Sequence, residues 1–296
     1  MMLKTLMEVM DLIESRDPVD KIRSKIEGRI KYEEKAVQDV TFIKALYDGG
    51  GENVEILGRL GAIQMSGVSK GLVSDADGAI VTLTTLLELL NLRDKGIELK
   101  VNASFVTNLS MKASLIPHSP FKFMVPPVGL DDALKIEVDP KASIILSIDS
   151  TKGNRLVKFD DFALTHVIKD GYILKLHDNL IDVYNRVTEH EIYMVPLTSG
   201  DLTPLDCDVY HISTLVSPWL YTSSQVIGLA TVSPRMIPGY DTGVTNLNML
   251  EHASRFTLEF LKYVENGGKV YNEKELEELE RRVGQSSLRK VQRMTS

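Results

Sequence analysis

The segment between Val54 and Val106 constrains the fold more strongly than any other, because strand and helix patterns alternate along it. Val54 to Leu57 is apolar enough for a strand, and Ala79 to Leu92 is rich in Leu, Ile and Val around most of its circumference, which predicts a buried helix. Gly96 stands where that helix should end. Ile97 to Val106 then alternates apolar and polar residues, as strands do. This order predicts a right-handed βαβ unit with a parallel pair of strands.

Other segments extend the same pattern into an α/β fold. Ser143 to Ile148 and Gln225 to Thr231 are too uniformly apolar for half-exposed strands, which is typical of the centre of a parallel sheet. Leu247 to Val264 has the spacing of a long amphipathic helix, whereas the charged stretch 31–35 has no defined pattern. Shorter strands are predicted at 40–46, 173–176 and 192–196, and further helices at 3–15, 19–26, 178–188 and 274–283.

The chain has no internal repeat, so we expect one domain over residues 1–284 and a polar, mobile tail over 285–296. A net charge of −7 argues against nucleic-acid binding, which needs clustered positive charge. No run approaches the roughly 18 apolar residues of a membrane-spanning helix, and the amino terminus lacks the apolar core of a secretory signal. The single cysteine, Cys207, fits a reducing compartment. We therefore expect a soluble, cytoplasmic protein.

Two acidic turns mark the expected ligand site. Residues 74–78 read Ser-Asp-Ala-Asp-Gly and precede the buried helix, and residues 149–155 read Asp-Ser-Thr-Lys-Gly-Asn-Arg and follow a buried strand. In an open α/β sheet, ligands bind outside the carboxyl ends of the strands. Both turns are therefore expected to line one crevice.

The first turn has a structural explanation for only part of its sequence. Ser74 and Asp77 are spaced as a capping box, and the helix dipole favours a carboxylate at this position. The capping pattern does not account for Asp75, which is therefore a candidate for catalysis or metal binding. Asp77 remains a candidate for contact with a substrate.

The second turn has two interpretations. Asp149 ends a buried strand, so its carboxylate needs a partner to offset the loss of solvation. Lys152 or Arg155 would supply one in a purely structural turn. Alternatively, Asp149 is a metal ligand or general base, and Lys152, Asn154 and Arg155 hold an anionic group, since the planar guanidinium of arginine binds carboxylates and phosphates bidentately.

Motifs for the common cofactors are missing from the chain. Neither of the common glycine-rich phosphate loops is present, and the six histidines form no His-x-x-x-His pair. The loop 198–206 supplies Asp201 and Thr203 as further candidates for substrate binding, and His211 follows closely.

Six short motifs together resemble an uncharacterised bacterial and archaeal family, domain of unknown function eleven seventy-seven. They read Gly-Arg-Leu-Gly (58–61), Gly-Leu-Val-Ser-Asp-Ala-Asp-Gly (71–78), Thr-Lys-Gly-Asn-Arg (151–155), Gly-Tyr-Ile-Leu (171–174), Asp-Leu-Thr-Pro (201–204) and Tyr-His-Ile (210–212). The resemblance covers nearly the whole chain and implies no particular activity. A histidine is common in the family where this chain has Asn108, so a role for that imidazole does not extend to this chain.

More distantly, the order of elements resembles the zinc aminopeptidases that carry a pair of metal ions. This resemblance implies that Asp75 bridges two metals and that Asp149 is another ligand. The other ligands of those enzymes are not matched, because Gly-Arg-Leu stands near their His-x-Asp, Ser110-Met111 near their Glu-Glu, and no histidine lies between 232 and 246. Zinc usually has four ligands with His or Cys among them. The resemblance therefore extends to the fold and not to the metal pair.

We expect a three-layer α/β/α fold with a mixed, mostly parallel sheet, similar to the aminopeptidase core. The expected function is that of a hydrolase-like enzyme acting on a small amide, peptide or carboxylate compound. Asp75 and Asp149 would hold a divalent metal (Mg, Mn or Zn, with oxygen ligands favouring Mg or Mn) or act as acid and base. Arg59, Lys152 and Arg155 would hold the anionic substrate. The alternative is a non-catalytic descendant of this fold that binds a metabolite or partner in the same crevice. Proteins with this fold often form oligomers, so we expect a homodimer.

Overall fold

The strands of the molecule place apolar residues against helices on both faces of one sheet. A computed structural model describes residues 2–59, 76–110, 114–117, 123–125, 127–152, 156–203, 212–233 and 246–293. Within these residues, ten strands form one sheet, and β5 (Ser114–Ile116) and β6 (Phe123–Val125) form a separate pair. The ten strands are β1 (Lys31–Val37), β2 (Val40–Asp48), β3 (Glu52–Gly58), β4 (Val101–Ser110), β7 (Ile144–Lys152), β8 (Phe162–Thr165), β9 (Val167–Lys169), β10 (Tyr172–Leu174), β11 (Met194–Val195) and β12 (Gln225–Ser233).

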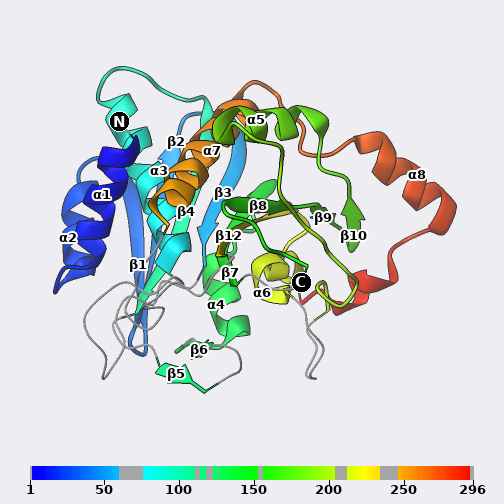
Figure 1. Ribbon diagram of the computed structural model, residues 1–296, viewed down its shortest axis with the longest axis horizontal. Helices are drawn as coiled ribbons and strands as arrows, with labels where there is room; N and C mark the ends of the chain where they lie inside the picture. Colours follow the sequence, from blue (N-terminus) through cyan, green and yellow to red (C-terminus); the bar gives the residue numbers. More distant parts are fainter. Residues whose placement is uncertain are drawn as a thin grey trace.

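The sheet is parallel at its centre and mixed toward its sides. Its main path runs β1-β2-β4-β3-β7-β12-β8-β11, and β9 and β10 extend it beside β12 (Figure 1). Strands β4, β3, β7 and β12 are parallel to one another, whereas β2 joins β4 and β8 joins β12 in antiparallel fashion. The predicted βαβ unit is confirmed, because β3 and β4 are parallel neighbours joined by a helix. The expected mixed α/β sheet is confirmed with it.

Helices form a layer on each face of the sheet. The larger core lies on the face covered by α1, α3, α5 and α7, with α2 packed outside against α1. A second core lies on the opposite face under α4, α6 and the short 3-10 helix η2. The helices are α1 (Met2–Ile13), α2 (Pro18–Ile26), α3 (Asp77–Arg93), α4 (Leu130–Glu137), α5 (Asp178–Thr188), α6 (Ser213–Val216), η2 (Ser217–Tyr221), α7 (Leu247–Glu265), α8 (Glu273–Val283) and η3 (Ser287–Val291).

The predicted buried helix is α3, and its start lies unusually close to the sheet. Every residue from Asp77 to Leu90 is buried. A Cβ atom on Gly78 would lie 2.6 Å from the carbonyl oxygen of Arg59 and 2.7 Å from that of Ile148. Only glycine therefore lets the first turn of α3 approach the ends of both β3 and β7.

Strands β1 and β4 depart from the sequence prediction. Strand β1 includes the charged stretch 31–35, and most of its residues are exposed, so no apolar alternation marks it. Charged side chains on such a strand discourage pairing with other chains. The strand predicted at 97–106 lies instead at Val101–Ser110, because the amides of Lys95, Gly96 and Ile97 still bond back to the last turn of α3.

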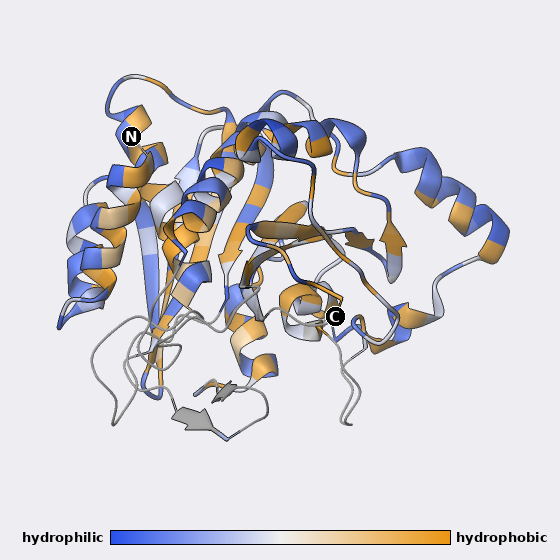
Figure 2. Cartoon of the chain, in the orientation of Figure 1, coloured by the Kyte–Doolittle hydropathy of each residue, from blue (hydrophilic) through white to orange (hydrophobic). Residues whose placement is uncertain are grey.

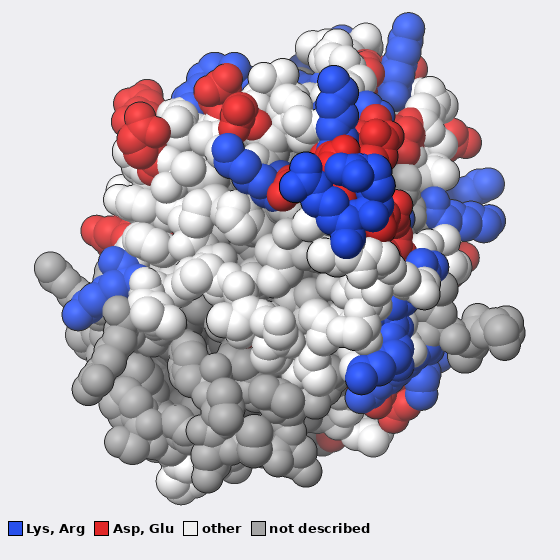
Figure 3. Space-filling model, turned by 90° about the vertical axis from the view of Figure 1, so that its right-hand side faces the viewer, with Lys and Arg blue, Asp and Glu red and all other residues white. Residues whose placement is uncertain are grey.

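The carboxyl-terminal part of the chain contains a polar helix followed by a docked segment. Helix α8 has no buried residue and is largely hydrophilic (Figure 2). Basic and acidic side chains lie intermingled on the face shown in Figure 3, and Arg281 and Arg282 both pair with Glu278. A mobile tail was predicted here, but the 3-10 helix η3 forms. The side-chain amide nitrogen Nε2 of Gln292 donates to the carbonyl oxygens of Trp219 and Thr222. Among the described helices, none combines the length and apolar character needed to cross a membrane.

Candidate functional site

The candidate site is the sheet edge where β4, β3, β7 and β12 end and β8 begins, which we call the carboxyl edge. The backbone amide of Arg59, directly after β3, donates to the carbonyl oxygen of Ile148 at 2.8 Å, so Arg59 and Asp149 occupy neighbouring positions. Across β12, Ala230 pairs with Asp149 and Thr231 pairs with Phe162. Asp149 and Asp161 therefore flank the end of β12, and the starts of α3 and α7 face the same edge.

Arg59 is part of a buried ionic network. Its Nη1 donates to Oε2 of Glu137 on α4, and Oε1 of the same carboxylate accepts from Nδ2 of Asn108 at 2.8 Å. The side chains of Arg59 and Glu137 are only 2% and 1% exposed. The Nε atom of Arg59 has no hydrogen-bond partner among the described residues. The predicted anion-binding arginine is thus already paired with one carboxylate and still has one buried donor to spare.

Asp149 is buried, as predicted, but it lies inside β7, which continues to Lys152, and not in a turn after the strand. The residue is 2% exposed, and its Oδ1 accepts from the backbone amide of Ser150 at 2.8 Å. A carboxylate removed from water in this way is stable only when its charge is compensated. This burial is expected of a catalytic or metal-binding acid and equally of a structural ion pair.

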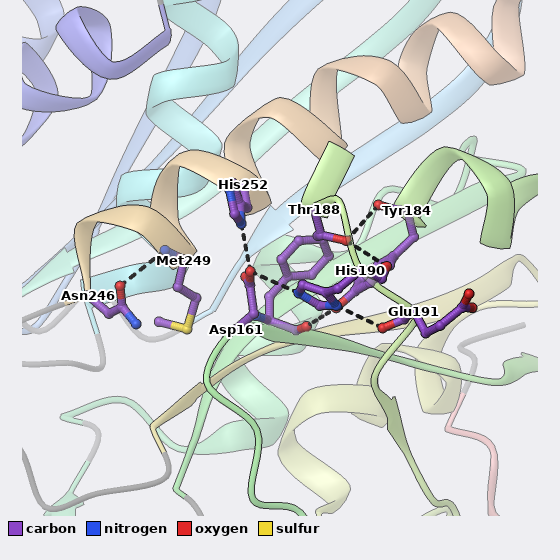
Figure 4. A network of polar contacts seen from close by, with 9 residues as sticks. Asp161, Tyr184, Thr188, His190, Glu191, Asn246, Met249 and His252 are labelled. Carbon is purple, nitrogen blue, oxygen red and sulfur yellow. Dashed lines mark hydrogen bonds and ion pairs between the residues drawn. The ribbon is translucent and has the colours of Figure 1, made fainter. Parts of the chain in front are cut away.

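A second cluster on the carboxyl edge joins one aspartate to two histidines (Figure 4). Oδ2 of Asp161, just before β8, lies 2.6 Å from Nδ1 of His252 on α7 and 3.3 Å from Nε2 of His190 after α5. The other carboxylate oxygen, Oδ1, accepts from the amide of Phe162 at 2.7 Å. Asp161 is 6% exposed, whereas the side chains of His252 and His190 are 27% and 31% exposed. The cluster therefore links a buried carboxylate to solvent through imidazoles.

The two imidazoles of this cluster differ in how many of their ring nitrogens face a hydrogen-bond acceptor. The hydrogen bond with Asp161 raises the pKa of His252 above its ordinary value of 6.5, although burial opposes the shift. In neutral His252, Nδ1 carries the proton toward Asp161, and Nε2 keeps its lone pair. Both nitrogens of His190 face oxygen acceptors, because Nδ1 lies 2.8 Å from the carbonyl oxygen of Glu191. His190 is further held by the ring of Tyr193, with centroids 4.5 Å apart.

The other predicted site residues do not share one environment. Asp77 is buried at the start of α3, 3% exposed, as its place in the capping pattern suggests. Asp201 serves its own loop, because its carboxylate accepts from the amide and hydroxyl of Thr198 and from the amide of Ile212. The amide of Thr203 donates to Gly200 in the same loop, and Lys152 is the last residue of β7. Four predicted site residues lie outside the described residues, namely Asp75, Asn154, Arg155 and His211.

Sequence reasoning did not find the cluster of Asp161, His190 and His252. The three residues come from separate segments, 29 and 91 positions apart from the aspartate, and form no short motif. One signal was available, since Asp161 directly precedes a buried strand and faces the edge where ligands bind in α/β folds.

Residues 31–293 match the family described as protein of unknown function (DUF1177). The chain belongs to this family. The resemblance inferred from the short motifs is thereby confirmed. A comparison with curated proteins finds no match in sequence.

Solved structures share the fold of this family member at low sequence identity. The bottromycin maturation enzyme BotP is 13% identical, with a TM-score of 0.58 over 89% of this chain and 70% of that one. A mutant of tomato leucine aminopeptidase is 11% identical, with a TM-score of 0.55 over 86% of this chain and 60% of that one. A glutaminyl cyclase from Macrostomum lignano is 10% identical, with a TM-score of 0.50 over 90% of each chain. The aminopeptidase-like α/β fold is confirmed by these likenesses.

The predicted divalent metal finds no complete site in the described part of this DUF1177 chain. No group of three or more His, Cys, Asp or Glu side chains there is arranged to hold a metal ion. One structure of BotP is a complex with Mn, at a TM-score of 0.56 and 13% identity. A metal shared by Asp149 and Asp75 therefore stays a prediction, because Asp75 lies outside the described residues.

Proposed function

We propose that this protein is a hydrolase-like enzyme that acts on a small amide, peptide or carboxylate compound at the carboxyl edge. One observation carries the proposal: a buried arginine directly after β3, Arg59, and a buried aspartate in the last part of β7, Asp149, occupy adjacent positions in the parallel centre of the sheet. Ligands of α/β sheets bind at such an edge. The likeness of the fold to a leucine aminopeptidase supports hydrolytic chemistry by analogy.

In this proposal Asp149 acts on the reacting bond, as a general acid or base or as a ligand of a divalent metal. Arg59, Lys152 and Arg155 attract the anionic end of the substrate, and Asp75 joins Asp149. A buried carboxylate suits this task because its proton affinity responds strongly to nearby charges. The metal would be magnesium, manganese or zinc, as the sequence predicts.

The test combines metal analysis with a survey of substrates. Protein purified without chelator or affinity-tag histidines is analysed for divalent metals, then assayed on amino-acid p-nitroanilides, dipeptides and N-acyl amino acids with added Mg²⁺, Mn²⁺ or Zn²⁺. Asp149→Asn is expected to abolish turnover while the protein stays folded. Asp178→Asn is the matched control, because that carboxylate is 81% exposed and pairs only loosely with Lys175, at 3.7 Å. Equal turnover by Asp149→Asn and the wild type would contradict the proposal.

The second candidate function is ligand binding without catalysis. It is favoured by the buried Nε of Arg59, which has no partner among the described residues. An unsatisfied buried donor costs about 1–3 kcal/mol, and an anionic ligand would offset that cost. Binding alone predicts that acetate, glutamate or phosphate raises the melting temperature without turnover, and that Arg155→Ala reduces the shift.

Location and assembly are proposed on sequence grounds. We propose a cytoplasmic protein that forms a homodimer and does not bind nucleic acid. Light scattering coupled to size-exclusion chromatography tests the dimer, and a retention assay on heparin tests the absence of a nucleic-acid surface.

A further inference from the structure

We propose that His252 is the general base of the carboxyl edge and that Asp161 is its positioning residue. This inference rests on the proposed hydrolytic function and names a catalytic group for it. It is carried by the geometry of three side chains, just before β8, just after α5 and on α7, that sequence patterns do not connect (Figure 4).

The bond between Asp161 and His252 fixes which nitrogen of the imidazole is basic. Oδ2 of Asp161 can only accept from Nδ1 of His252 when the carboxylate is ionised, and the two atoms are 2.6 Å apart. The imidazole is then held with its lone pair on Nε2. Nε2 has no hydrogen-bond partner among the described residues, and the side chain is 27% exposed. A general base needs this combination of fixed tautomer, free lone pair and access to water.

Asp161 is itself held on several sides. Its Oδ1 accepts from the amide of Phe162, and its Oδ2 also faces Nε2 of His190. The ring of Phe162 packs against Tyr184, with centroids 4.6 Å apart, and the hydroxyl of Tyr184 donates to the carbonyl oxygen of Phe162 at 2.6 Å. The carboxylate therefore has little freedom to turn away from His252.

His190 is not an equivalent base, although it shares the same carboxylate. Its Nδ1 is 2.8 Å from the carbonyl oxygen of Glu191, which can only accept, so Nδ1 carries a proton. Its Nε2 points at Asp161 and has no free direction toward a substrate. The structure thus assigns one histidine to chemistry and the other to support of Asp161.

The position of His252 agrees with the proposed site. Asp161 and Asp149 lie on the two sides of the end of β12, since Thr231 pairs with Phe162 and Ala230 pairs with Asp149. Helix α7 begins at this edge and presents His252 close to its start. A substrate held by Arg59 beside Asp149 would meet the imidazole from the other side of β12.

The chemical step is the addition of water to an amide. Nε2 of His252 takes one proton from water while the oxygen of that water forms a bond to the carbonyl carbon. The resulting imidazolium returns this proton to the amide nitrogen as the bond between carbon and nitrogen breaks. One water is consumed, and the products are a carboxylic acid and an amine. General-base assistance of this kind contributes about 10²–10⁴-fold to the rate.

A purely structural role is the competing explanation, because Asp161 also ties β8 to α5 and α7. The first experiment tests the required tautomer without any substrate, and the turnover measurements below separate the two explanations. Long-range ¹H–¹⁵N spectra of labelled protein report the tautomer of neutral His252, which is expected to carry its proton on Nδ1. Asp161→Asn is expected to change that tautomer ratio. A neutral His252 with its proton on Nε2 in the wild type overturns the proposal.

The second experiment measures turnover of the same p-nitroanilides, dipeptides and N-acyl amino acids. His252→Gln is expected to lower kcat by at least 100-fold with a smaller change in KM, and added imidazole is expected to restore part of the activity of His252→Ala. The matched control is His166→Gln, since His166 follows the opposite end of β8 and its Nδ1 accepts from the amide of Leu176. Circular dichroism confirms that each variant is folded.

The outcomes separate the two proposals. An equal kcat for the wild type and His252→Gln overturns the role of His252 and leaves the proposed function standing. Absence of turnover by the wild type on every substrate overturns both. The pH profile adds a readout that a structural residue would not move. Its acidic limb reports the protonation of His252, which is influenced by the charges of Asp161, Glu251 and Arg255, with His190 on the same carboxylate. That limb is expected to shift in Asp161→Asn.

Discussion

Arg59, the residue that follows β3, donates from Nη1 to Oε2 of Glu137 on α4, and both side chains are almost entirely removed from solvent. This pair connects the carboxyl edge of the sheet to the helix layer beneath it. Because Oε1 of Glu137 also accepts from Asn108, one carboxylate joins the ends of β3 and β4 to α4. The geometry at the candidate site thus depends on a buried ion pair.

Breaking that ion pair is expected to cost far more than replacing it. Glu137→Leu should lower the free energy of unfolding by about 3–5 kcal/mol, because it leaves the guanidinium of Arg59 buried without a counter-charge. The double variant Arg59→Met/Glu137→Leu should cost less than the sum of the two single variants. Urea denaturation of the four proteins measures this difference, and strictly additive losses would contradict a coupled pair.

Glu55 is expected to make stability fall with rising pH. Burial raises the pKa of this carboxyl from an ordinary 4.5 to about 8 in the folded protein. The folded state therefore binds the proton more tightly than the unfolded state, and the stabilisation is complete below pH 4.5 and is lost as the pH rises toward 8. The difference in unfolding free energy between wild type and Glu55→Gln, measured at several pH values from 5 to 8, should shift against the wild type. A difference that does not change over this range would exclude the effect.

His252 is expected to titrate above pH 6.5, because Asp161 stabilises the imidazolium. NMR titration should show a midpoint above 6.5 in the wild type and a lower midpoint in Asp161→Asn, where the charge of the partner is gone. The raised pKa also means that this pair stabilises the fold below pH 6.5 and loses that effect as the pH rises through the midpoint. Identical midpoints in the two proteins would show that the bond to Asp161 does not control this histidine.

Gly78→Ala is expected to disturb the carboxyl edge directly. The new methyl group would lie 2.6 Å from the carbonyl oxygen of Arg59 and 2.7 Å from that of Ile148, and backbone atoms cannot move aside easily. We expect a loss of about 1–3 kcal/mol in thermal or urea unfolding. Gly129→Ala is the matched control, because its Cβ would meet no atom within 4 Å. Equal stability of the two variants would argue against the close approach of α3 to β3.

The sequence predicted most of the helices and strands that bury one face or all of their side chains. The uniformly apolar β7 and β12 and the helix α3 were recognisable because a parallel sheet and its covering helices need continuous apolar surface. The hydropathy pattern did not predict strand β1, because both faces of this strand are largely exposed. An edge strand is held by hydrogen bonds to its neighbour, and these leave no period in side-chain hydropathy.

The site was predictable in part for the same reason. Asp149 follows a strand pattern and Asp77 stands at a helix start, so their positions at the carboxyl edge were expected and both are buried. Asp201 carries the same residue type in a loop, yet its carboxylate is occupied by Thr198 and Ile212. Residue type and loop position alone do not separate a binding residue from one that holds its own loop.

By itself, the sequence determined the α/β class and the parallel centre of the sheet, and it predicted the edge at which we propose that a ligand binds. These depend on local periodicity and on the fixed handedness of strand–helix–strand units, which are properties of neighbouring residues. Only the tertiary structure decided that Arg59 pairs with Glu137 and that Asp161 meets His190 and His252. Such contacts join segments up to 91 positions apart. They form because packing brings the ends of different strands and helices together. Local sequence patterns do not reveal such long-range contacts.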